Sequence, residues 1–307
     1  MAKRVGLIVL LAVGAPLLIG LALLVEAHVE LRGLERPLPS SEERAGLRSG
    51  PGGPVSVAWI ESGLQRRSDG TYSTTGGFLL SWADGRTFLI DAGMTESGMR
   101  EFGEALEFAM GADPAEVFGS VGAQLGPRAS RLVGIGMTHL HHDHTEGAGE
   151  LCAARDGAPL ALVQLPDQAD LGNYTTDRGR EALMGAPCIE SERLARPNEG
   201  AIHPVDGLPG LGAFAAGGHT PGSTVFVARL PDRLVWFAGD ITNEHAALLE
   251  NRGKSWIYST LMVPENTGRL DELRRWLAAR HAEPASFVVV SHDRRGMSEA
   301  GIEDFAR

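Results

Sequence analysis

The sequence feature that most constrains this chain is a cluster of histidines directly after an apolar segment. Residues 132–137 are predicted to form a β-strand, and the next seven residues read THLHHDH (138–144). In an extended chain, side chains two residues apart lie on the same side, so His139 and His141 project together. Imidazoles and a carboxylate this close suit Zn²⁺ or another borderline divalent ion. A polar, solvent-facing loop is the alternative, but the position at the end of a core strand favours a metal site.

The N-terminus carries a second strong feature, an apolar stretch at residues 5–25 without a charged side chain. As a helix with a rise of ~1.5 Å per residue, it would be roughly 30 Å long, enough to span the hydrocarbon core of a bilayer. Lys3 and Arg4 precede it and acidic residues follow it, which places the short N-terminus in the cytoplasm. We therefore predict a transmembrane anchor over residues 1–30, with the catalytic domain outside the cytoplasm. A cleaved signal peptide, which would leave a secreted or periplasmic protein, is the alternative.

The remaining chain divides into a short connection and one large domain. Residues 31–54 are rich in proline, glycine, serine and charge, a composition that predicts a linker rather than a packed element. From there on, strand and helix signals alternate, so residues 55–307 are predicted to form one α/β domain in which helices cover the sheets.

One part of this domain lacks a clear pattern. Residues 166–212 are rich in glycine and proline and have no regular apolar period. A long loop without its own secondary structure is usually a lid or a binding loop. We therefore expect this segment to overhang the histidine cluster, with Tyr174 and the Leu183-Met184 pair as candidates for contact with a substrate.

Charge and cysteine content narrow the function classes. The formal net charge of −11 and the absence of a basic cluster argue against a nucleic-acid partner. Two cysteines, Cys152 and Cys188, are too few for a disulfide scaffold. If the domain is exported, the two could pair; otherwise they are two unrelated small buried residues.

The run HLHHDH resembles the HxHxDH signature of the metallo-β-lactamase superfamily. Four other landmarks of that family occur in the family's order, one before this run and three after it: FLIDAG (88–93), GHTPGS (218–223), FAGD (237–240) and VSHD (290–293). The resemblance covers residues 55 to about 293. It implies an αββα sandwich, an α/β fold with two facing sheets and helices outside, here preceded by the predicted transmembrane helix.

The resemblance also implies a site for two divalent metal ions, with zinc as the expected element. The implied ligands are His139, His141 and His219 for the first ion, Asp143, His144 and His292 for the second, and Asp240 between them. Asp91 would orient a ligand or a loop without touching metal.

The implied reaction is hydrolysis of a small molecule by water activated between the two ions, with Asp143 as the catalytic residue that aims it. A lactone or ester is the leading substrate class. Quorum-signal lactonases share the bridging Asp, but their usual Tyr shortly after it is absent here. The alternatives are β-lactamase-type amide hydrolysis, disfavoured by Asp240, and a mononuclear iron dioxygenase similar to persulfide dioxygenases. His245 is a further candidate for the substrate pocket, with a solvated loop histidine as the alternative.

Overall fold

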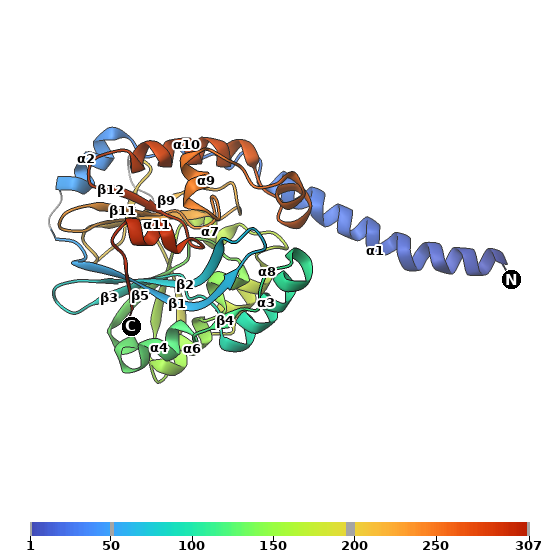
Figure 1. Ribbon diagram of the computed structural model, residues 1–307, viewed down its shortest axis with the longest axis horizontal. Coiled ribbons are helices and arrows are strands. Elements are labelled where there is room, and N and C mark those ends of the chain that lie inside the picture. The colour runs from blue at the N-terminus through green and yellow to red at the C-terminus, as the bar shows by residue number, and fades with distance from the viewer. Residues whose placement is uncertain (1, 50–51, 195–199, 306–307) are drawn as a thin grey trace.

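The computed structural model describes residues 2–49, 52–194 and 200–305. Two β-sheets face each other, and helices cover the outer face of each, as Figure 1 shows. The first sheet consists of β1 (Ser56–Arg66), β2 (Tyr72–Ser81), β3 (Thr87–Ile90), β4 (Glu116–Val117), β5 (Leu132–Gly136), β6 (Leu160–Gln164), β7 (Ile189–Arg193) and β13 (Glu303–Asp304). The second sheet consists of β8 (His203–Pro204), β9 (Leu211–Ala215), β10 (Thr224–Arg229), β11 (Leu234–Phe237) and β12 (Ser286–Val289).

The strand order is β13-β1-β2-β3-β5-β6-β7 in the first sheet, with β4 paired to β1, and β12-β11-β10-β9-β8 in the second. We call the apolar layer between a sheet and its covering helices the outer core of that sheet. The outer core of the first sheet includes side chains from α4 (Val121–Leu125), α6 (Ala148–Ala154) and α8 (Asp177–Met184). That of the second includes side chains from α9 (His245–Leu249) and α10 (Thr267–His281). The other helical elements are α3 (Glu96–Met110), η1 (Gly126–Arg131), α5 (His142–Thr145), α7 (Pro166–Asp170), η2 (Tyr258–Met262) and α11 (Arg294–Glu299). These four layers confirm the predicted αββα sandwich.

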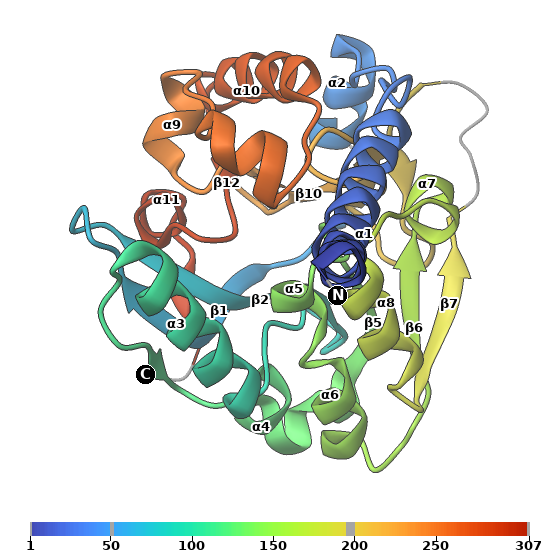
Figure 2. The ribbon, with the colours of Figure 1, turned by 90° about the vertical axis from the view of Figure 1, so that its right-hand side faces the viewer.

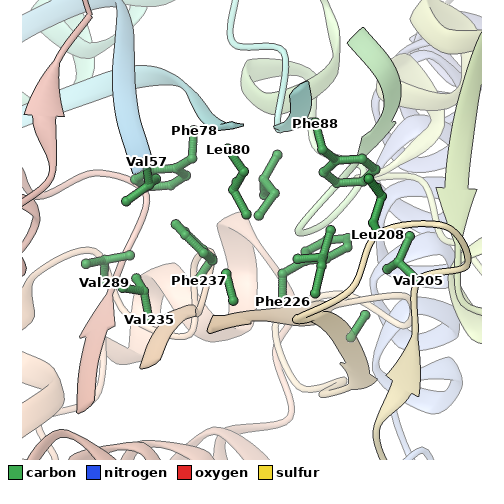
Figure 3. Close-up of a cluster of buried hydrophobic side chains, with 14 of the residues drawn as sticks. Val57, Phe78, Leu80, Phe88, Val205, Leu208, Phe226, Val235, Phe237 and Val289 are labelled. Atoms are coloured by element: carbon green, nitrogen blue, oxygen red, sulfur yellow. The ribbon is translucent and has the colours of Figure 1, made fainter. Parts of the chain in front are cut away.

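Aliphatic and aromatic side chains fill the space between the sheets (Figure 3). Phe78 of β2 meets Phe237 of β11 with 4.9 Å between ring centroids, and Phe88 of β3 meets Phe226 of β10 at 6.3 Å. Because side chains alternate along a strand, the neighbours of these residues point outward to the helices. Each strand of this core therefore has both faces buried, and its loops at one edge are held in fixed positions.

Residues 31–54 do not form the predicted unpacked linker. Residues 41–49 form helix α2 (Ser41–Ser49), and Leu38 and Leu47 pack against the outer core of the second sheet. Ser40 and Glu43 form a capping box, in which each side chain bonds the other residue's backbone N–H at 3.2 and 2.8 Å. Local capping and two leucines thus outweigh the polar composition. Residues 50–51 lie outside the described part.

The segment 166–212 is not the irregular loop that its composition predicted. In its described residues it contains α7, α8, β7 and β8 and enters β9. Strand β7 pairs in parallel with β6 at the edge of the first sheet, and four of its five residues are exposed. A strand exposed in this way needs no apolar alternation, which explains why the sequence pattern did not indicate it. Residues 195–199 lie outside the described part.

Cys152 of α6 and Cys188, just before β7, form a disulfide with 5.4 Å between their Cα atoms. The sequence had left this pairing open. Disulfides persist in oxidising compartments, which agrees with the predicted location outside the cytoplasm. That location stays a prediction.

Helix α1 (Ala2–Glu30) projects from the domain (Figure 1). Its C-terminal end is attached, since Ala27 and Leu31 are buried and His28 Nε2 lies 3.1 Å from the carbonyl oxygen of Thr260. Within the part of the chain that the structure describes, no helix has the length and apolar character of a membrane span. The predicted transmembrane helix therefore finds no support in the fold.

The disulfide gives a direct stability prediction. It joins residues 36 positions apart, and in the unfolded chain it restricts a loop of that length, an effect of about 4 kcal/mol. We expect Cys152→Ala/Cys188→Ala to lower the free energy of unfolding by about that amount in urea titrations. A reductant should lower the stability of the wild type and leave the double variant unchanged. Equal stability of oxidised wild type and double variant would contradict the prediction.

Candidate metal centre

The loops at one edge of the two sheets bring all seven predicted ligands together. Strand β5 runs directly into the histidine run, whereas β11 and β12 each end just before a ligand of their own, and the loop between β9 and β10 supplies another. The ligands are His139 and His141 after β5, Asp143 and His144 on α5, His219 before β10, Asp240 after β11 and His292 after β12.

Three histidines form the first group of the candidate centre. The Nδ1 atom of His141 lies 3.1 Å from Nε2 of His139 and 3.1 Å from Nε2 of His219. Burial lowers the pKa of all three, that of His141 to about 3 with a further contribution from His219. The imidazoles are therefore neutral at physiological pH, the form that binds a metal ion.

The second group combines Asp143, His144 and His292. The Oδ2 atom of Asp143 lies 3.6 Å from Nε2 of His144 and 3.5 Å from Nε2 of His292. Burial lowers the pKa of His144, but the carboxylates that face it outweigh burial and raise this pKa to about 10. The negative field that holds a proton on His144 equally favours a metal cation at this position.

Asp240 lies between the two groups. Its carboxylate oxygens are 3.5 Å from Nε2 of His144, 3.0 Å from His292 and 3.8 Å from His219. Two buried atoms, Oδ1 of Asp240 and Nε2 of His144, have no hydrogen-bond partner among the described residues. A buried polar atom without a partner is costly. Both atoms face the other ligands, so the donor set fits divalent cations, with Asp240 able to bridge them.

Asp91 contacts the histidine loop, and its orienting role stays a prediction. It ends β3 with a φ of 63°, a conformation rare for residues other than glycine. Its carboxylate accepts hydrogen bonds from the backbone N–H of Thr138 at 2.7 Å and from the Thr138 hydroxyl at 2.8 Å. It also lies 3.0 Å from Nδ1 of His144. Through these contacts Asp91 would fix both the start of the histidine loop and the direction of one ligand.

The sequence reasoning missed a buried group behind His219. Glu265 Oε1 lies 2.6 Å from Nδ1 of His219, and Ser259 donates to Glu265 Oε2 at 2.6 Å. Lys254 pairs with Glu265 at 2.9 Å and donates to the carbonyl oxygen of Asp240 at 2.9 Å. Although burial raises the pKa of Glu265, Lys254 and His219 lower it to about 2. An ionised Glu265 accepts a hydrogen bond from Nδ1–H of His219, which leaves Nε2 of His219 free toward the other ligands.

One weak signal could have found this group. The chain has only two lysines and uses arginine elsewhere, and Lys254 is the one within the domain. No motif, however, connects it with His219, which lies 35 residues away.

Of the two residues predicted to line a substrate pocket, Tyr174 and His245, only Tyr174 lies next to a residue that contacts the first group. Tyr174 is half-buried next to Thr175, whose hydroxyl lies 3.1 Å from Nε2 of His141. The segment thus reaches the first group, but the contact is made by Thr175, and the role of Tyr174 stays a prediction.

Both predictions for His245, as a residue of the substrate pocket and as a solvated loop histidine, were wrong. Its side chain is buried, its ring packs against His281 at 4.6 Å, and it lines none of the cavities described below. The reason is that α9 begins at His245 and directs the ring under α11, against Gly296.

A cavity of about 260 Å³ is lined by Lys254, which donates to the carbonyl oxygen of Asp240, but by none of the seven candidate ligands. Its lining includes Arg67, Met110, Thr242, Asn243, Lys254 and Tyr258. Burial and the nearby carboxylates of Asp240, Glu265 and Asp143 raise the pKa of Tyr258 well above its usual value. Its hydroxyl therefore stays protonated and can donate a hydrogen bond into the site. Beyond an ion pair between Arg67 and Glu244 lies a larger cavity of about 800 Å³, which contains none of the seven ligands.

A family profile described as the metallo-beta-lactamase superfamily matches residues 78–292, a span that contains all seven candidate ligands. The chain belongs to the metallo-beta-lactamase superfamily. No curated protein sequence matches it.

Several solved structures share the fold of this chain. An N-acyl homoserine lactone hydrolase with N-hexanoyl-L-homoserine bound at its metal centre is 14% identical, with a TM-score of 0.58 over 83% of this chain and 99% of that one. A mutant of B. thuringiensis AiiA with N-decanoyl-L-homoserine bound at its active site has the same values. A probable metal-dependent hydrolase from Staphylococcus aureus is 14% identical, with a TM-score of 0.54 over 79% of this chain and 90% of that one. At such identity the likeness concerns the fold alone.

Glu265 provides a test of the first group that does not depend on any substrate. Glu265→Gln keeps the size of the side chain but removes the charge that holds the Nδ1 proton of His219. We expect the affinity for one Zn²⁺ ion to fall by about 10- to 100-fold, measured by competition with a chromophoric chelator. Glu272→Gln is the matched control, because Glu272 is half exposed and pairs with Arg269 at the surface of α10. Equal zinc affinity of the two variants would contradict the role of Glu265.

Proposed function

We propose that this protein is a hydrolase that uses two zinc-like ions to open a lactone or an ester. The observation that carries this proposal is the pair of three-residue groups with Asp240 between them. Such an arrangement leaves space for water and substrate, as a catalytic rather than a structural site requires. When bound, the ions lower the pKa of a shared water toward neutrality and polarise a substrate oxygen.

The chain's own residues would then orient the reactants. Asp143 is partly exposed, in contrast to Asp240, and its carboxylate can accept a hydrogen bond from the attacking water. Tyr258 and Lys254 line the adjoining cavity. The protonated hydroxyl of Tyr258 supplies a hydrogen-bond donor for the substrate's carbonyl or leaving oxygen. Together these groups would hold a small ester or lactone against the centre without a covalent intermediate.

The similarity of the fold to N-acyl homoserine lactone hydrolases supports the choice of lactones. β-Lactamase-type amide hydrolysis is less well supported. β-Lactamases with an all-histidine first site typically lack a bridging carboxylate, whereas Asp240 contacts both groups here. A mononuclear iron dioxygenase needs one two-His-one-carboxylate centre with open positions. Two complete groups favour two ions over one.

Metal removal and restoration separates these alternatives. After treatment with a chelator, we expect hydrolysis of lactones to be lost and then restored by about two equivalents of Zn²⁺ per chain. The full-length protein should be assayed against lactones, simple esters, β-lactams and a persulfide. Restoration of oxygen consumption by one equivalent of Fe²⁺, without hydrolysis, would replace this proposal with the dioxygenase.

The role of Asp143 yields a sharper prediction. Asp143→Asn keeps size and one oxygen but removes the negative charge, so the second group should lose its ion while His139, His141 and His219 retain theirs. Because the attacking water also loses its acceptor, we expect kcat to fall at least ~10²-fold. Metal content by mass spectrometry and steady-state kinetics measure the two effects. Asp113→Asn, at an exposed ion pair with Arg66, is the control. Two ions and near-wild-type kcat in Asp143→Asn would contradict the mechanism.

A further inference from the structure

Four large apolar side chains lie exposed in one short segment. Trp256 is 69% exposed, Ile257 59%, Leu261 50% and Met262 48%. We call these four residues the apolar rim. Single exposed apolar residues are common on soluble proteins, but four large ones within seven consecutive residues indicate a contact surface.

The apolar rim belongs to the same turn that builds the candidate site. Between its members, Tyr258 lines the cavity beside Asp240, and Ser259 is buried and donates to Glu265. Met110, at the end of α3, lines the same cavity and is 40% exposed. The rim therefore borders this cavity, which Lys254 connects to Asp240 of the candidate centre.

Helix α1 continues this apolar surface. It is attached beside the rim, through His28 to the carbonyl oxygen of Thr260 and through the carbonyl oxygen of Leu31 to Asn266. Figure 2 views the molecule from the side on which α1 projects, and α3, α5 and α8 lie around the helix on that side. Since α5 carries Asp143 and His144, the helix leaves the domain on the side of the metal centre.

The exposed side chains of α1 indicate what covers this surface. Leu17, Leu18 and Ile19 are 68%, 68% and 61% exposed. Successive residues of an α-helix point about 100° apart, so these three face three different directions. A protein partner or a second copy of this chain would cover one side of the helix, whereas an apolar medium covers all sides.

We propose that the apolar rim and the exposed part of α1 contact a lipid bilayer, so that the cavity beside the metal centre opens at the membrane surface. An interfacial tryptophan beside aliphatic side chains suits this position, because its ring is apolar and its N–H can reach water. The substrate is then an amphiphile, with the hydrolysable lactone or ester near the headgroups and an acyl tail in the bilayer. The substrate class rests on the proposed hydrolase function; the bilayer contact does not.

Tryptophan fluorescence tests the contact directly. Of the five tryptophans, Trp256 is exposed, Trp276 is partly buried and the other three are buried. The full-length protein is reconstituted in phosphatidylcholine vesicles with or without brominated acyl chains. We expect brominated lipid to quench the emission of wild type and of Trp276→Phe, and the quenching to be lost in Trp256→Phe. Emission from Trp256 that brominated lipid leaves unchanged would overturn the proposal. Protection of Trp256 from acrylamide that depends on protein concentration without lipid would instead show a second copy on the rim.

Substrate preference tests the consequence for catalysis. In Ile257→Glu/Leu261→Glu, hydrolysis of a long-chain lactone dispersed in the vesicles should fall at least about tenfold, since two charges oppose the interface. Hydrolysis of a short-chain, water-soluble lactone should stay unchanged, and Leu249→Glu, exposed on α9, serves as the control for both. Equal losses on both substrates, or none on the long one, would contradict the role of the rim. If the hydrolase proposal is wrong, neither lactone is cleaved, yet the fluorescence result stands.

Discussion

The structure depends on one constraint, the burial of Asp240 among histidines at the meeting edge of two sheets. A buried carboxylate is costly unless charges or donors surround it. Here His144, His219 and His292 all approach its oxygens, and each comes from a different loop. The aromatic core behind them keeps these loops in place, since Phe237 lies three residues before Asp240 and packs directly against Phe78 of the facing sheet. The apolar core thus fixes the positions of the loops, and the carboxylate of Asp240 at the sheet edge is available to bind metal ions.

The seven candidate ligands could be named from the sequence because each lies in a short motif at a strand end. Glu265, Lys254 and Ser259 could not, since their positions are fixed by contacts across the fold rather than by neighbours in sequence. For residues 31–54 and 166–212, the sequence predicted less regular structure than the fold contains. Composition predicted loose chain in both, but α2 is stabilised by its capping box and two leucines, and β7 is a polar edge strand. The fold class is a property of the overall pattern and was predicted correctly, whereas local packing is not visible in composition.

The cavity residues show the same limit in another form. Quorum-signal lactonases usually have a tyrosine shortly after the bridging aspartate. This chain has Asn243 and His245 there, which by sequence alone argues against lactonase chemistry. The structure brings Tyr258 to the cavity beside Asp240 instead, after the chain has passed through α9. A hydroxyl donor can thus be supplied from a different point in the sequence, because a reaction requires a group at a position in space. Its raised pKa arises from burial and from the carboxylates of the centre itself.

The turn around η2 connects two properties that are usually separate. Its inner side chain Ser259 bonds Glu265, which in turn holds His219, so the turn supports one ligand of the first group. Its outer side chains form the apolar rim. The turn has π-helical form, a geometry that is frequent at functional sites. Within η2, Ser259 bonds Glu265 from the inner side, whereas Leu261 and Met262 face outward as part of the rim. In this fold, contact at the rim and geometry at the metal centre are therefore parts of one local structure.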